Sequence, residues 1–156
     1  MQVRSPQEAF YIACEMERSA VQLYSRAITL MEQLGRKDEP LYARLCQMLA
    51  EEQEHLRRFC DLYTGLDATS EQLLLGAVAE GVLFQGGLMA AARQGLLRDP
   101  ESMLRFAMNA ETTSARKYRE FAQLTDDEQA RSTLLTIAAE EDRHLGDLAL
   151  QAAQHA

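Results

Sequence analysis

The stretch AEEQEHL at residues 50–56 recurs, with two changes, as AEEDRHL at residues 139–145. In both copies a Glu and a His stand three residues apart, so the two side chains project from the same face of a helix. A single Glu-x-x-His pair is a weak signal, because most such pairs lie on a solvated face. The repeated pair indicates two helices with matching roles. These pairs are Glu52 with His55 and Glu141 with His144.

A second repeat accompanies the first. Glu17 precedes Tyr24 by seven residues, and Glu111 precedes Tyr118 by seven residues. Each of these Glu–Tyr segments comes before one of the Glu-x-x-His segments along the chain. We therefore predict two similar helix pairs, each consisting of a Glu–Tyr helix followed by a Glu-x-x-His helix.

Capping and helix-breaking residues divide the chain into helices. Gly35 and Gly65 follow the first two expected helices, and Pro40 restarts the chain between them. No segment alternates apolar and polar residues as a strand does, so we expect an all-α fold. Residues with capping chemistry precede the other helices: Ser5, Thr69, Asp99 and Thr125. The predicted helices span about residues 6–34, 40–63, 70–95, 100–124 and 126–153.

Apolar residues follow four of these helices in alternating steps of three and four, which is the pattern of a helix bundle. Short links make 6–34 and 40–63, and likewise 100–124 and 126–153, antiparallel pairs. The long crossover around 70–95 lets 40–63 and 100–124 run parallel. Each apolar stripe is interrupted near its middle by a Glu, or by a Glu and a His. A buried carboxylate is costly unless it is paired or bound to a metal, so these interruptions predict a metal site.

Packing the four stripes together brings four carboxylates and two imidazoles to one level of the core. Four carboxylates balance the charge of two divalent cations, and the mixture of oxygen and nitrogen ligands suits iron or manganese, with zinc also possible. We expect each metal to take one His and one terminal Glu, with Glu52 and Glu141 bridging and Glu17 and Glu111 terminal. The six candidate ligands are Glu17, Glu52, His55, Glu111, Glu141 and His144.

Two neighbouring residues are alternative ligands. Glu51 and Glu140 each lie four residues before a motif His, which also places them on the same side of the helix. The register of the apolar stripes favours Glu52 and Glu141 as the ligands instead.

Tyr24 and Tyr118 lie on the stripes too, where they are either plain core aromatics or hydrogen-bond donors to a ligand carboxylate.

The constellation resembles the ferritin-like di-iron carboxylate superfamily, in which two helices each contribute a Glu and two others each contribute Glu-x-x-His. The resemblance covers essentially the whole chain, as one domain over residues 1–156, and bacterioferritin and the rubrerythrin family are similar groups. It implies a ferritin-like four-helix bundle with two non-haem iron ions. Bacterioferritins carry a haem-ligating Met between the Glu and the His of the second helix. Gln53 and Glu54 stand there in this chain, so we expect no haem.

The resemblance also implies an oxidoreductase that reduces hydrogen peroxide or O2 with electrons from an external donor. Rubrerythrins usually carry a rubredoxin domain and a further carboxylate near the position of Ser114, and this chain has neither. It therefore resembles an erythrin-like domain without rubredoxin. The alternatives are iron oxidation and handling of the ferritin type, hydroxylation of an organic substrate, and a structural or sensory metal bundle. Only twelve residues follow His144, so we do not expect the fifth helix of a ferritin cage.

Length and composition fit one globular domain. The chain has 156 residues, and its 24 acidic and 16 basic residues give a formal net charge of −8. We expect no nucleic-acid binding, because phosphate neutralisation needs clustered Lys and Arg. The three Cys form no CxxC pair, and the first ten residues lack the apolar segment of a signal peptide. We therefore expect a cytoplasmic protein.

The segment 73–92 is apolar and contains one charged residue, Glu80. Its length would allow a membrane span, but four glycines and Gln85 disfavour that interpretation. Its place between the two helix pairs fits a crossover helix. Small residues allow helices to approach closely, so we expect the segment to form a subunit interface in a homodimer.

Overall fold

The structure is a computed structural model that describes residues 2–79, 95 and 98–154. These residues contain five helices and no strand, which confirms the all-α prediction. The long helices match the predicted ranges to within two residues at each end. Their bounds are α1 Pro6–Gln33, α2 Pro40–Leu62, α3 Ala68–Ala79, α5 Pro100–Ala122 and α6 Glu128–Gln154.

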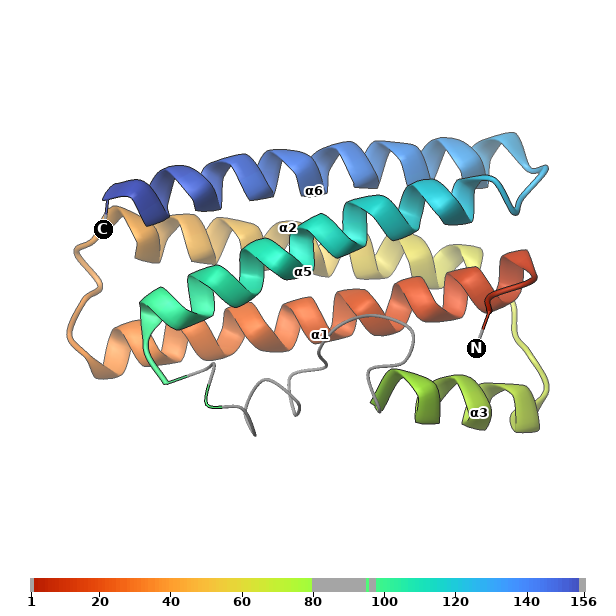
Figure 1. Ribbon diagram of the computed structural model, residues 1–156, viewed down its shortest axis with the longest axis horizontal. Coiled ribbons are helices and arrows are strands. Elements are labelled where there is room, and N and C mark those ends of the chain that lie inside the picture. The colour runs from red at the N-terminus through yellow and green to blue at the C-terminus, as the bar shows by residue number, and fades with distance from the viewer. Residues whose placement is uncertain (1, 80–94, 96–97, 155–156) are drawn as a thin grey trace.

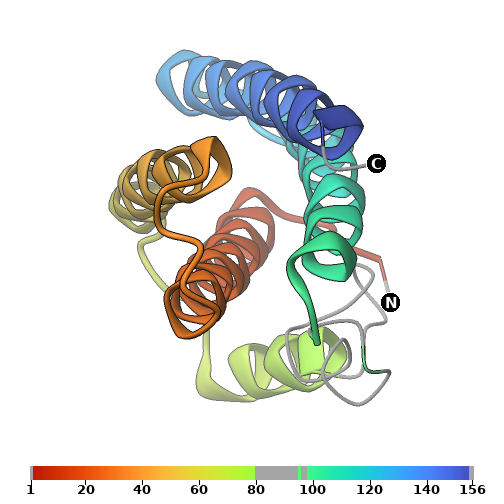
Figure 2. The same cartoon turned by 90° about the vertical axis from the view of Figure 1, so that its left-hand side faces the viewer.

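The four long helices form a bundle, with α3 lying outside it beside α1 (Figure 1). Helix α1 packs against α2 and α5 packs against α6, and in each pair the helices are antiparallel. Helices α2 and α5 run in the same direction, as the long crossover predicted. The end-on view in Figure 2 shows the two pairs side by side, with α1 facing α5 and α2 facing α6.

Except for α2, the described helices begin at a capping side chain, and two of these caps differ from the predicted ones. The Ser5 side chain accepts a hydrogen bond from the backbone N–H of Glu8, as expected. Helix α3 begins after Asp67 rather than Thr69, and Asp127 rather than Thr125 accepts the N–H of Ala130 at 2.8 Å. In both cases a nearby Asp replaces the predicted Thr, because a carboxylate caps a helix and also complements its dipole.

The first helix ends where predicted. Gly35 has a φ of 68°, a left-handed conformation that glycine adopts without steric cost. The N–H of Arg36 bonds back to the carbonyl of Met31 at 2.9 Å and closes the last turn of α1. The chain then turns directly into α2, which fixes the antiparallel pairing of the two helices.

The predicted crossover helix 70–95 is described in part. Helix α3 covers its beginning, residues 80–94 lie outside the described part of the chain, and Gly95 lies in a turn with a φ of 71°. On α3, Leu73 and Leu75 are exposed. Among the described residues, no helix is long and apolar enough to cross a membrane. The subunit interface expected for segment 73–92 stays a prediction.

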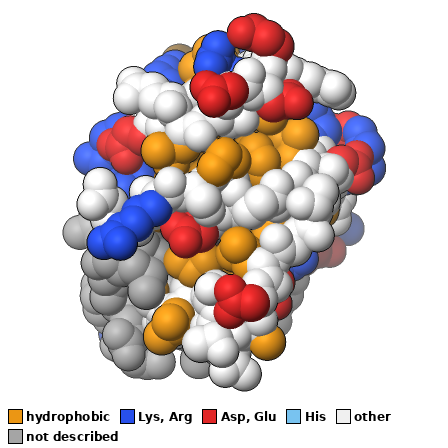
Figure 3. All heavy atoms as spheres, turned by 90° about the vertical axis from the view of Figure 1, so that its right-hand side faces the viewer, with side chains coloured by type: hydrophobic (Ala, Val, Ile, Leu, Met, Phe, Trp, Pro, Cys, Tyr) orange, Lys and Arg blue, Asp and Glu red, His pale blue; other side chains and the backbone are white. Residues whose placement is uncertain are grey.

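The core consists of two apolar clusters, one around Tyr118 and the other around Tyr24. Partly buried side chains, among them Leu62 and Tyr63, pack against the Tyr118 cluster. At the end of the bundle shown in Figure 3, apolar side chains reach the surface between charged ones. The Tyr118 cluster includes Phe10, Ile12, Phe59, Tyr118, Leu134 and Ile137. The Tyr24 cluster includes Leu23, Tyr24, Met31, Leu41, Met48 and Leu148. On every long helix the candidate ligands fall between the parts that belong to these clusters, so the polar residues form a layer in the middle of the bundle.

Candidate metal centre

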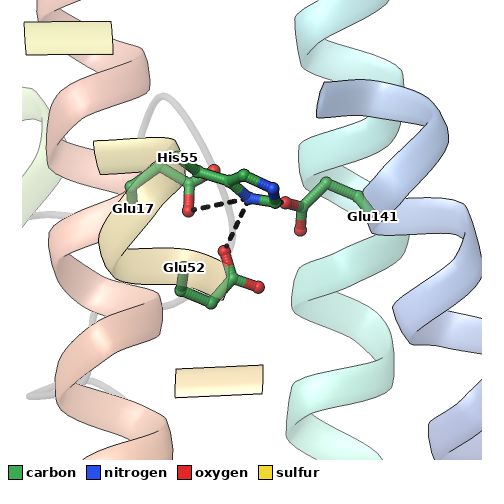
Figure 4. Close-up of side chains that lie close together, drawn as sticks. All are labelled: Glu17, Glu52, His55 and Glu141. Carbon is green, nitrogen blue, oxygen red and sulfur yellow. Dashed lines mark hydrogen bonds and ion pairs between the residues drawn. The ribbon is translucent and has the colours of Figure 1, made fainter. Parts of the chain in front are cut away.

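All six predicted ligands lie in this buried layer. Each of the four long helices contributes a Glu from its inward face, and α2 and α6 also contribute a His. None of the six residues exposes more than 3% of its surface. In Figure 4, Glu17, Glu52 and His55 approach from α1 and α2, and Glu141 approaches them from α6 on the opposite side. The stripe pattern thus correctly identified which polar residues are buried.

The six side chains form two overlapping groups that could each hold a metal ion. One group contains Glu17 and His55, the other contains Glu111 and His144, and both contain Glu52 and Glu141. Within each group, one ligand atom from every residue lies within 4.8 Å of the others. Shared carboxylates between two groups are the arrangement that bridging ligands require.

Glu52 lies between the two imidazoles. One of its oxygens, Oε2, is 3.2 Å from Nδ1 of His55, and the other, Oε1, is 3.0 Å from Nδ1 of His144. The two rings are stacked with their centroids 5.8 Å apart. From the opposite helix pair, Oε1 of Glu141 lies 2.7 Å from Nδ1 of His55. Both imidazoles therefore direct Nδ1 into the carboxylate cluster.

The outer nitrogen of each imidazole contacts a Glu from the opposite helix pair. Nε2 of His55 lies 2.5 Å from Oε2 of Glu140, and Nε2 of His144 contacts Glu51 in the same way. These two Glu are the alternative ligands of the sequence analysis, and neither belongs to the two groups of possible ligands. They instead fix the orientation of each ring, because the outer N–H needs an acceptor.

The role of Glu51 and Glu140 was missed from the sequence. Their repeated position next to the stripe Glu was visible, but the direction in which each side chain points was not. In the structure both are partly exposed, and an arginine lies on the outer side of each. Glu140 is 3.7 Å from Arg58, and Glu51 is 3.6 Å from Arg143. A polar connection therefore runs from each buried imidazole to the surface.

The two tyrosines hold the carboxylates of the opposite helix pair. The Tyr118 hydroxyl donates a hydrogen bond to Oε1 of Glu17 at 2.6 Å, and the Tyr24 hydroxyl donates one to Oε1 of Glu111. Both tyrosines are fully buried, so each hydroxyl needs such an acceptor. Each bond fixes one oxygen of a carboxylate and leaves the other oxygen available.

Several buried oxygens of the cluster lack a hydrogen-bond partner among the described residues. They are Oε2 of Glu17, Oε2 of Glu111 and Oε1 of Glu141. The last of these is near His55 but not in hydrogen-bonding geometry. Buried polar atoms are rarely left unpaired, so the oxygens fit a site that metal ions complete. The donor set of four carboxylates and two imidazoles fits two divalent cations.

Without metal, the cluster concentrates negative charge in the core. Burial raises the pKa of Glu17 and of Glu141 well above the ordinary value, and repulsion from neighbouring carboxylates adds to the effect. Burial and the charge of Glu52 raise the pKa of Glu111 as well. In the metal-free protein these carboxyl groups therefore keep their protons to higher pH than ordinary carboxyl groups, and a bound cation would favour their loss.

The pKa values of Glu52 and His144 are shifted toward the charged form of each group, unlike those of the other three carboxyl groups. Burial disfavours the ionised form of Glu52, but its interactions with the Glu17 carboxyl and with the imidazoles of His144 and His55 outweigh that effect and lower its pKa. Burial also disfavours the charged imidazole of His144. Hydrogen bonds to Glu111 and Glu52 outweigh that effect and raise its pKa to about 10. Metal binding at neutral pH must therefore displace a proton from this ring.

Comparison with known protein families decides which group the chain belongs to. The rubrerythrin family model matches residues 8–151, which include nearly all of the four long helices and every candidate ligand. The chain belongs to the rubrerythrin family. Neither a curated protein nor a solved structure matches it. Family membership and the buried Glu/His cluster together fit a di-iron protein.

Replacing Glu141 by Gln is expected to stabilise the metal-free protein at high pH. The pKa of Glu141 is raised in the folded state above the ordinary value of 4.5. Below that value the carboxyl is neutral in both the folded and the unfolded state, so its burial costs no ionisation energy. As the pH rises through the folded-state pKa, ionisation of the buried carboxyl lowers the stability of the fold. At pH 8 we expect the chelator-treated variant to unfold with a free energy higher by about 1 kcal/mol or more. Thermal unfolding followed by circular dichroism between pH 5 and pH 8 measures the difference.

The matched control is Glu32→Gln on the exposed surface of α1, which should leave the pH dependence unchanged. The expected difference between Glu141→Gln and the parent protein shrinks as the pH falls toward 5, because the raised pKa of Glu141 increasingly favours the uncharged carboxyl there. A parent protein more stable than the variant at pH 8 would contradict the raised pKa of Glu141.

Proposed function

We propose that this rubrerythrin-family chain is a non-haem di-iron oxidoreductase that reduces hydrogen peroxide, O2 or both. The observation that carries the proposal is the pair of four-residue ligand groups that share Glu52 and Glu141. Two sites with common carboxylates suit a dinuclear centre, whereas a structural metal needs one closed site. Membership of the rubrerythrin family supports oxygen species as substrates.

In this proposal the six buried residues hold the two iron ions. Glu17 and His55 would hold one ion, Glu111 and His144 would hold the other, and Glu52 and Glu141 would be available to both. Nδ1 is the coordinating nitrogen of each imidazole, because the outer nitrogen already contacts a Glu. When bound, ferrous ions supply the two electrons that convert hydrogen peroxide, with two protons, into two molecules of water.

The surrounding residues position these ligands and handle protons. The hydroxyls of Tyr24 and Tyr118 hold one oxygen of Glu111 and of Glu17, which limits how far those carboxylates can rotate. The two apolar clusters above and below the layer keep bulk water away from the reacting oxygen atoms. The partly exposed Glu51 and Glu140 connect the imidazoles with the surface and provide a route for protons.

The electrons come from outside the chain in this proposal. Cys14, Cys46 and Cys60 include no CxxC pair of the kind that holds a rubredoxin iron. In this proposal an external donor would supply the electrons for each reaction. Oxidation of iron as a substrate, in the manner of ferritins, is the principal alternative, and the number of irons taken up distinguishes the two functions.

The first prediction concerns the ligands. We expect the parent protein to bind two Fe(II) per chain under anaerobic titration, one for each ligand group. Replacing both Glu52 and Glu141 by Ala should abolish binding of the second ion while the protein stays helical by circular dichroism. Glu54→Ala is the control, because Glu54 belongs to the same repeat but is exposed and pairs with Arg57. Two irons bound by the double variant would refute the ligand assignment.

A second prediction tests Glu140 as a positioning residue. Glu140→Gln keeps an acceptor for Nε2 of His55 but removes the charge that strengthens the imidazole as a ligand. We expect Fe(II) affinity to fall about 10- to 100-fold. The thermal stability of the metal-free protein should stay close to that of the parent, which separates positioning from a structural role. Glu54→Gln is the matched control, and an unchanged affinity in Glu140→Gln would contradict the proposed role.

The reaction itself is tested by mixing the ferrous protein with each oxidant. We expect oxidation by hydrogen peroxide to be faster than oxidation by O2, on the order of tenfold or more. Stopped-flow absorbance of the ferric product measures both rates, with the double Ala variant as the background. Faster reaction with O2, together with iron uptake continuing beyond two ions per chain, would instead support the ferritin-type function.

A further inference from the structure

Two of the three cysteines lie in contact on neighbouring helices, and neither belongs to the two groups of possible metal ligands. Cys60 near the end of α2 donates a hydrogen bond to Cys14 on α1, with the two Sγ atoms 3.4 Å apart. Both are free thiols, and Cys14 is buried whereas Cys60 is exposed. The pair was not apparent from the sequence, because 46 residues separate its members.

The geometry suits disulfide formation. A disulfide bond is about 2.05 Å long, so the two sulfur atoms need to approach by a little over an ångström. The antiparallel packing of α1 and α2 holds the sulfurs together, which removes the entropic cost of bringing them into contact. Solvent reaches Cys60 directly, so a small oxidant can react with it before the buried partner.

Arg18 adds a polar group at the exposed sulfur. Its guanidinium Nη2 donates a hydrogen bond to Sγ of Cys60 at 4.0 Å, while Nη1 pairs with Glu15. Burial raises the pKa of the Cys14 thiol, which therefore keeps its proton at neutral pH. The two thiols thus have different environments, one exposed and next to a cation, the other protonated and enclosed. This asymmetry assigns the first reaction to Cys60.

We propose that Cys60 and Cys14 form a second, metal-independent site that reduces hydrogen peroxide. The Cys60 thiolate attacks one peroxide oxygen, the O–O bond breaks, and the products are a sulfenic acid on Cys60 and, after protonation, one water. The Cys14 sulfur then attacks the Cys60 sulfur, its thiol proton leaves with the hydroxyl as a second water, and the disulfide forms. Two molecules of an external thiol return the pair to the reduced state and become a disulfide themselves.

Cys46, the third cysteine, serves as an internal control for the general reactivity of the thiols toward peroxide. It lies on α2 like Cys60 but fourteen residues earlier, which corresponds to about 21 Å along the helix. It is free and only partly exposed. A general reactivity of the thiols toward peroxide would modify Cys46 as well, whereas the proposed site leaves it reduced.

The test treats the reduced full-length protein, after removal of metal by a chelator, with one equivalent of hydrogen peroxide. We expect the free thiols to fall from three to one, with a mass loss of two hydrogen atoms and full recovery after dithiothreitol. Cleavage after Arg and Lys places each cysteine in a different peptide, so mass spectrometry without reduction identifies the linked pair. Cys46→Ser should give the same Cys14–Cys60 link as the parent.

Two variants separate the proposed steps. Cys60→Ser, at an exposed position, should leave Cys14 reduced and abolish peroxide consumption by the metal-free protein. Cys14→Ser, checked first for a helical circular dichroism spectrum, should stop at a sulfenic acid on Cys60 that dimedone traps. Three free thiols after peroxide treatment, over-oxidation of Cys60 without a link, or a link only between chains would each overturn the proposal. Because metal is absent throughout, none of these results depends on the di-iron function.

Discussion

The burial of four carboxylates at one level of a helix bundle is the constraint on which the rest of this structure depends. Moving ionised groups out of water costs several kcal/mol each unless compensating charge lies beside them. Two imidazoles compensate only part of this charge. Three carboxyl groups consequently have raised pKa values, and three of their oxygens have no hydrogen-bond partner among the described residues. The fold therefore provides a site for cations at the expense of its metal-free stability.

The polar layer also connects the two halves of the chain. Four contacts within it join one helix pair to the other: Tyr24 reaches Glu111, Tyr118 reaches Glu17, His55 reaches Glu140, and His144 reaches Glu51. The two Tyr–Glu contacts correspond to each other, and so do the two His–Glu contacts, when the two helix pairs are exchanged. The centre therefore has an approximate twofold symmetry. Each half consequently supplies the groups that orient the ligands of the other half, so neither helix pair contains a complete site.

The two oxidant-reactive sites that we infer use different parts of this architecture. The carboxylate layer lies between two apolar clusters, and its imidazoles contact the partly exposed Glu140 and Glu51. The Cys14–Cys60 pair belongs to the α1–α2 helix pair alone, with Cys60 exposed. One centre needs both halves of the chain and bound metal, whereas the other needs only the packing of two neighbouring helices.

The amino-acid pattern alone predicts the long helices, their pairing and the burial of the six candidate ligands. Helical periodicity fixes which side chains share a face, so a Glu or a His on an apolar stripe must be buried wherever the helix packs. Local sequence does not determine which atom meets which across the bundle. The outward orientation of Glu51 and Glu140, the exchanged tyrosine contacts and the contact between Cys14 and Cys60 all depend on the relative positions of helices distant in sequence. Those positions follow from packing of the whole bundle, so they become visible only when the helices are assembled in three dimensions.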